Sequence, residues 1–147
     1  MNVKYKNFII ATVMLLPLFF AQAVLAANSG DVVNFNVEKN IEASEKSTVQ
    51  SVLVKTTAGL YFYVEKVWWE AQLPAKKTEI LQSLDSLASE FSGRIYPILT
   101  SVFGSEWNPG VDGDSRITVL FHSMKEGSVG YFRSVDEYVK LQVPDSN

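Results

Sequence analysis

A stripe of apolar side chains between residues 80 and 95 constrains the fold of this chain more than any other feature. Its members recur at steps of one, three or four residues, as expected for one face of a helix: Ile80, Leu81, Leu84, Leu87, Ala88, Phe91 and Ile95. Pro74 suits the first turn of that helix. Gly93 and Pro97 predict a break or kink near residues 92–95, followed by a second short helix, roughly 94–103, that ends at Gly104. The chain is therefore expected to carry one or two helices in its middle.

Strand-forming residues lie on both sides of this helical region. Residues 48–57 are rich in β-branched side chains, and residues 60–67 are dense in aromatic ones, with a Thr-Ala-Gly turn between them. This order predicts an antiparallel hairpin. Residues 117–121 are nearly all apolar, which is typical of a strand covered on both faces, and residues 130–132 suggest a short aromatic strand. The predicted fold class is α+β: a hairpin, one or two amphipathic helices, then a buried strand.

The first 26 residues have the three parts of a secretory signal. Lys4 and Lys6 form a positive start, and residues 8–20 form an apolar run of 13 residues. Such a run is shorter than the roughly 20 residues that a membrane-spanning helix needs, which favours cleavage over an uncleaved anchor. The small residues at 24 and 26 favour cleavage before Ala27, with Ala21 and Ala23 as an earlier alternative. We therefore expect a secreted or extracytoplasmic protein without a stable membrane anchor after cleavage.

The remainder of the chain is acidic and has no cysteine. Two of the 13 basic residues lie in the leader, so 11 remain against 16 acidic ones, a net charge of −5. A nucleic-acid partner is not expected, because binding phosphates requires clustered Lys and Arg. Residues 27–48 are predicted to be a polar leader or linker, with one weak edge strand possible where Val33, Phe35 and Val37 alternate. Residues 49–147 are predicted to form the folded domain.

Few residues are placed for catalysis. His122 is the single histidine, so neither a Ser-His-Asp triad nor an H-E-x-x-H zinc site is predicted, and we assign no catalytic or metal-binding residue. His122 is expected to be a structural, half-buried residue. The carboxylate pairs Glu65 with Glu70 and Asp136 with Glu137 have no spacing specific enough to assign glycosidase roles.

Two further motifs each allow two interpretations. Asp112-Gly113-Asp114-Ser115-Arg116 begins like a calcium loop, but Arg116 stands where a third ligand is needed, so a tight Asx-type turn is the favoured interpretation. The pair Trp68-Trp69 suggests either a carbohydrate-stacking platform or a strand-to-helix junction that closes one end of the core. The junction is favoured because large aromatic side chains dominate burial.

Several specific motifs occur together in this chain: YFYVE at 61–65, the two tryptophans, IYP at 95–97, FGSEWNPGVDGD at 103–114, RITVL at 116–120, and GYF at 130–132 with Ser134, Asp136, Glu137 and Tyr138. This combination resembles the amino-terminal part of secreted bacterial zinc metallopeptidases of the zincin clan. The likeness is to the hyicolysin-like group, related to immune-inhibitor-A-type enzymes, and it covers about residues 49–147.

The resemblance implies a hydrolase of protein or peptide substrates, in which zinc activates the attacking water. It also implies that the zinc ligands and the general-base glutamate come after residue 147, so that this chain is an incomplete zincin-like subdomain and binds no zinc itself. Gly130, Tyr131 and Phe132 would lie near the edge of the substrate cleft, where a peptide can form main-chain hydrogen bonds.

Two other functions remain open. The chain could be a secreted binding or adhesion module that uses Trp68, Trp69 and Trp107 as a contact surface, or a non-catalytic remnant that folds only with a partner chain. The isolated fragment is predicted to be poorly stable, because one helix covers only one face of a strand as apolar as residues 117–121.

Overall fold

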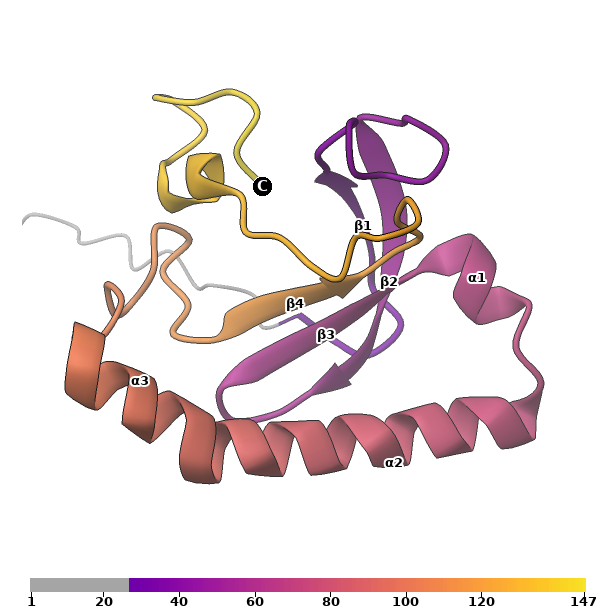
Figure 1. Ribbon diagram of the computed structural model, residues 1–147, viewed down its shortest axis with the longest axis horizontal. Coiled ribbons are helices and arrows are strands. Elements are labelled where there is room, and N and C mark those ends of the chain that lie inside the picture. Colours follow the sequence, from indigo (N-terminus) through magenta and orange to yellow (C-terminus); the bar gives the residue numbers. More distant parts are fainter. Residues whose placement is uncertain (1–26) are drawn as a thin grey trace, which may run out of the picture.

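The computed structural model describes residues 27–147, so the predicted secretory signal lies outside the described residues. Figure 1 shows one α+β unit in which helices lie along one side of a curled four-stranded sheet. In chain order the elements are β1 (Val32–Asn36), β2 (Thr48–Thr56), β3 (Leu60–Glu65), α1 (Lys66–Glu70), α2 (Pro74–Glu90), a π-helical turn (Phe91–Ile95), α3 (Tyr96–Phe103), β4 (Ile117–Phe121) and a 3-10 turn (Ser134–Glu137). Within the described range, no helix is both long and apolar enough to span a bilayer.

The sheet has the strand order β1-β2-β3-β4. The first three strands are antiparallel neighbours, and β4 pairs in parallel with β3, with Leu60 opposite Ile117 and Val64 opposite Phe121. The helices connect β3 to β4, because a parallel pair requires a long crossover connection. The predicted hairpin is confirmed as β2 and β3, and the weak edge strand expected within residues 27–48 is β1.

The helical side of the sheet carries the larger of two apolar clusters. Alternate residues of β3 (Leu60, Phe62 and Val64) pack there with Leu84 of α2, and Phe62 is fully buried. Other members of the predicted helical stripe pack against this cluster: Ile80, Leu81, Ala88 and Phe91. Most of the predicted stripe therefore faces the core, and α2 begins at Pro74 as expected. Leu87 differs from the prediction, because it is 41% exposed and does not belong to the cluster, and Ile95 does not belong to it either.

The helix does not break at the predicted place but changes there from α-helical to π-helical geometry. Residues 91–95 form a π-helical turn that contains Gly93, and α3 ends where Gly104 adopts a φ of 82°. This left-handed conformation suits glycine, which lacks the Cβ atom that would be strained there. The two helical segments therefore continue into one another through the turn (Figure 1).

The opposite side of the sheet carries the second cluster. Tyr61 and Tyr63, the alternate residues of β3, pack there with Phe35 of β1 and Leu53 of β2. The rings of Phe35 and Tyr63 meet edge to face, with centroids 4.9 Å apart. In Figure 1 the C-terminal segment, in yellow, lies away from the helices.

Two predicted strands differ from the structure. β4 is a strand, but none of its five residues is buried, because it lies at the edge of the sheet rather than inside it. Residues 130–132 form no strand: they lie in an extended loop without a ladder partner. Within this segment, Tyr131 makes side-chain contacts that are described below, whereas Phe132 is exposed.

Candidate functional site

The carboxyl ends of β3 and β4 place three polar side chains beside one cavity. Glu65 is the last residue of β3, and His122 and Ser123 follow directly after β4. Because these strands are parallel, their carboxyl ends meet at the same end of the sheet, where ligands commonly bind in open α/β sheets. The cavity has a volume of about 250 Å³ and is lined by Val64, Glu65, Trp68, Phe121, His122 and Ser123.

Glu65 and Ser123 form the polar part of this cavity. The Oε2 atom of Glu65 accepts hydrogen bonds from the Ser123 hydroxyl, at 2.8 Å, and from the Ser123 backbone N–H, at 3.1 Å. The other oxygen, Oε1, accepts no hydrogen bond from the described residues. The carboxylate therefore retains an unused acceptor.

His122 is held by two hydrogen bonds that determine which ring nitrogen carries the proton. Its Nδ1 lies 3.0 Å from the Ser123 carbonyl oxygen, which can only accept, so in the neutral ring Nδ1 carries the proton. Its Nε2 lies 3.1 Å from the Tyr131 hydroxyl and must then accept from it. The same hydroxyl accepts the backbone N–H of Glu38 at 3.3 Å. His122 is thus the structural, half-buried residue that the sequence predicts.

Tyr131 is the one residue of the predicted substrate-binding segment that joins this site. Its ring meets His122 edge to face, with centroids 5.7 Å apart, and burial raises the pKa of its hydroxyl. Phe132 is 74% exposed and Gly130 is also exposed. The segment therefore contacts the His122 ring through Tyr131 and does not lie along a sheet edge. The edge strand beside the cavity is β4.

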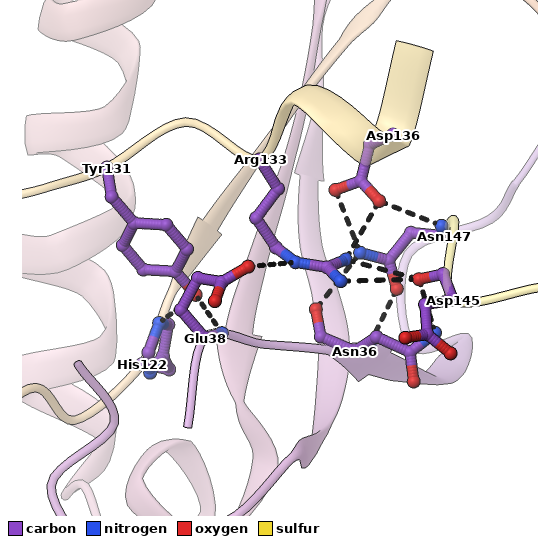
Figure 2. A network of polar contacts seen from close by, with 8 residues as sticks. All are labelled: Asn36, Glu38, His122, Tyr131, Arg133, Asp136, Asp145 and Asn147. Carbon is purple, nitrogen blue, oxygen red and sulfur yellow. Dashed lines mark hydrogen bonds and ion pairs between the residues drawn. The ribbon is translucent and has the colours of Figure 1, made fainter. Parts of the chain in front are cut away.

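Arg133 anchors the segment that follows Tyr131 (Figure 2). Its side chain is only 9% exposed, and its guanidinium contacts Glu38 at 3.2 Å and Asp136 at 2.8 Å. It also donates to the backbone carbonyl of Asp145. The amide of Asn147 completes the network by bonding both the N–H and the carbonyl of Asn36 in β1. The network therefore attaches the C-terminal segment to β1.

The calcium-like turn lies at the opposite end of β4. The Asp112 side chain accepts the Asp114 N–H at 3.0 Å, and the Asp114 side chain accepts the Arg116 N–H at 2.9 Å, which is the predicted Asx-type geometry. The Asp114 carboxylate also accepts the Tyr61 hydroxyl at 2.7 Å and pairs with the Arg116 guanidinium at 3.0 Å. The positive charge of the Arg116 guanidinium, so close to Asp114, would repel a bound cation. The bond from Tyr61 of β3 to Asp114 instead joins the turn before β4 to β3.

Burial and charge shift the pKa values in this cluster. Burial by itself would raise the pKa of Asp114, but the Tyr61 hydroxyl and the Arg116 backbone and side chain outweigh it and lower that pKa. Burial, with help from Asp114, raises the pKa of Tyr61. Both groups are therefore held in their usual states at neutral pH, the carboxylate charged and the phenol neutral.

The two tryptophans of the predicted junction have different surroundings. Both lie in α1, directly after β3, which confirms the junction. Trp69 packs against the helix-side core, whereas Trp68 is 44% exposed and lines the cavity. Trp107 is 82% exposed and follows α3, which lies at the opposite end of the helical layer from α1 (Figure 1).

The cavity does not pair the Ser123 hydroxyl with the His122 ring. The Ser123 hydroxyl faces a carboxylate and not the His122 ring, so the two do not form a nucleophile–base pair. In residues 27–147, no three His, Cys, Asp or Glu side chains are grouped closely enough to hold a metal ion. What remains is an aromatic cavity with one free carboxylate oxygen.

Neither Glu65 nor Ser123 was predicted to take part in a site. Their approach depends on the parallel pairing of β3 with β4, which residue composition does not show. The sequence does contain a useful signal. The charged residue Glu65 ends one strand-forming run, the polar residues His122 and Ser123 directly follow the next, and a helical region separates the two runs. Comparison with protein-family models finds no match, and searches of curated proteins and of solved structures find none either.

Proposed function

We propose that this chain is the amino-terminal, peptide-binding part of a secreted zinc metallopeptidase. One structural feature supports it most: β4 has a strand neighbour on one side only among the described residues, and a cavity lies at its carboxyl end. An extended peptide can add to such an edge through main-chain hydrogen bonds and place alternate side chains on each face. The motif resemblance supplies the reaction class, which is hydrolysis of a peptide bond.

The described residues do not fit a zinc centre, since they include no suitable group of three ligands. The proposal therefore assigns the zinc ligands to sequence beyond residue 147 and gives residues 27–147 the tasks of binding and orienting substrate. No catalytic step is assigned to His122, Ser123 or Glu65.

The decisive experiment examines the natural secreted product. Antibodies raised against residues 27–147 would capture it from culture medium, and mass spectrometry would determine its sequence and its amino terminus. We expect a product that begins near Ala27, extends through an H-E-x-x-H segment and hydrolyses peptides in a chelator-sensitive way that zinc restores. A product that ends at Asn147 would contradict the proposal.

A secreted binding module is the second candidate. Phe103, the last residue of α3, and Trp107, in the loop after it, are 81% and 82% exposed, and exposed apolar surface commonly marks contact surfaces. This candidate would replace the first if the natural product carried no zinc motif.

A further inference from the structure

We propose that the cavity beside His122 binds the basic side chain, Arg or Lys, of an extended peptide that adds to β4. This inference rests on the proposed function and names the chemistry of the substrate. It is based on three observations: the hydrogen-bonding state of the polar atoms in the cavity, its aromatic walls, and its position relative to the free edge of β4.

The polar side chains of the cavity favour a donor-rich, cationic group. The Ser123 hydroxyl already donates to Glu65, and the Nδ1–H of His122 donates to the Ser123 carbonyl. The Nε2 atom of the same ring is occupied by Tyr131. The Oε1 atom of Glu65 accepts no hydrogen bond from any described residue, so the cavity presents an unmatched carboxylate oxygen. Guanidinium and ammonium groups match it, because they carry several donors and no acceptor.

The aromatic walls favour the same ligand. Trp68 and Phe121 line the cavity and are 44% and 39% exposed. Aromatic rings stabilise a nearby cation, and their surfaces also suit the aliphatic stem of Lys or Arg. The volume of about 250 Å³ is smaller than that of pockets for drug-sized ligands, roughly 300–1,000 Å³, and is appropriate for one long side chain.

The place of the cavity in the fold connects it to the strand edge. Phe121 is the last residue of β4, and its ring stacks on Phe62, which belongs to the helix-side core. The cavity therefore lies on the helical side of the sheet, between α1 and the end of β4. A peptide paired with β4 directs every second side chain to this side. One such side chain, near Phe121, would enter the cavity.

The inner wall of the cavity is anchored, so the site is preorganised. The Ser123 carbonyl accepts the Ala43 N–H at 3.2 Å, and the Lys125 N–H donates to the Ile41 carbonyl at 2.8 Å. An isolated antiparallel bridge also joins Glu42 to Met124. These contacts hold the segment after β4 in place, and a prepared site loses less free energy when it binds.

The test compares matched peptides on the purified protein. A set of fluorescent hexapeptides with strand-forming sequences would carry one Arg at each position in turn, and a second set would carry citrulline, which has the same shape but no charge. Fluorescence anisotropy gives the dissociation constants. We expect the best Arg peptide to bind about tenfold tighter than its citrulline twin, which corresponds to one charge-assisted hydrogen bond.

Two variants assign this preference to the cavity. Glu65→Gln keeps the size of the side chain and its ability to accept from Ser123 but removes the charge, so the Arg preference should fall to less than threefold. Glu70→Gln removes the same charge from an exposed position of α1 outside the cavity, and it should leave the preference unchanged.

Each outcome has a distinct meaning. Equal binding of Arg and citrulline peptides to the unmodified protein would overturn the basic preference but leave peptide binding intact. A preference that survives Glu65→Gln would place the basic site elsewhere on the chain. The absence of any peptide binding would overturn both this inference and the peptide-binding role, whereas the peptidase assignment fails separately if the natural product lacks a zinc motif.

Discussion

Strands β3 and β4 have similarly apolar sequences but very different surroundings. The first five residues of β3 are all buried, whereas β4 has no buried residue and its Phe121 is 39% exposed. Both strands contact the helix-side cluster, and Leu120 of β4 also packs against the other cluster. The difference is that β3 has a strand on each side, whereas β4 has one on a single side. Position in the sheet, rather than hydrophobicity, therefore determines how deeply these strands are buried.

The largest expected effect tests this comparison with two phenylalanines. Phe62 is fully buried in β3, so Phe62→Ala should lower the free energy of unfolding by about 3–5 kcal/mol. Phe121→Ala should lower the free energy of unfolding by less than about 1.5 kcal/mol, because its ring is already partly exposed and its removal takes less buried apolar area from the folded state. Urea denaturation followed by circular dichroism measures both. Equal losses would mean that β4 is covered as fully as β3.

The same comparison explains which features the sequence predicted. The helical stripe and the β2–β3 hairpin were predicted correctly because their patterns are local: a period near 3.6, and two strand-forming runs joined by a Gly-containing turn. The prediction that residues 117–121 are covered on both faces was wrong, because an apolar run has the same composition at the edge of a sheet as in its centre. What decides the outcome is whether a strand lies on both sides, and β4 has a neighbour on one side only among the described residues.

The candidate site was harder to predict for a related reason. The motif resemblance singles out Tyr131 with Gly130 and Phe132, but the contacts of Tyr131 are with Glu38 and His122, which lie on other parts of the chain. Glu65 was considered with Glu70, its neighbour in sequence, whereas its actual partner is Ser123. A cavity formed where two strands end requires the strand pairing to be known first.

A smaller effect is expected where β4 is attached to β3 at its other end. Asp114 accepts the Tyr61 hydroxyl and pairs with Arg116, so Asp114→Asn should lower the free energy of unfolding by about 1–2 kcal/mol at pH 7. The Asp114 pKa is lower in the folded state than its ordinary value of 3.8, so the folded protein binds fewer protons. Its contribution is therefore complete above the unfolded pKa and is lost as the pH falls through the folded pKa.

Chemical denaturation between pH 7 and pH 2.5 measures this dependence. The difference between the unmodified protein and Asp114→Asn should narrow below about pH 4. Asp85→Asn is the matched control, because that side chain is 63% exposed in its pair with Lys55 and should contribute less than about 0.5 kcal/mol. A constant difference across this pH range would show that the Asp114 charge is not what holds β4.

The smallest expected effect concerns the carboxyl end of β4, where the sheet edge meets the cavity. Tyr131→Phe removes one hydroxyl that joins His122 to the Glu38 backbone, so it should cost about 0.5–1 kcal/mol, the usual contribution of such bonds. Tyr138→Phe is the control, because Tyr138 is 49% exposed and its hydroxyl forms no hydrogen bond with the described residues. The stability change alone is small, so the state of the His122 ring provides a second measurement.

Long-range proton–nitrogen NMR distinguishes the two tautomers of a histidine, and His122 is the single histidine of the chain, so its signals need no further assignment. At a pH where the ring is neutral, we expect the Nδ1–H form, because the Ser123 carbonyl requires a donor and Tyr131 supplies a proton to Nε2. Tyr131→Phe should shift the Nε2 resonance while Nδ1 keeps its proton. An Nε2–H form in the unmodified protein would mean that His122 turns a donor toward Tyr131. The tautomer therefore tests whether the two hydrogen bonds of His122 hold the residues at the carboxyl end of β4 in place, even though β4 is an edge strand.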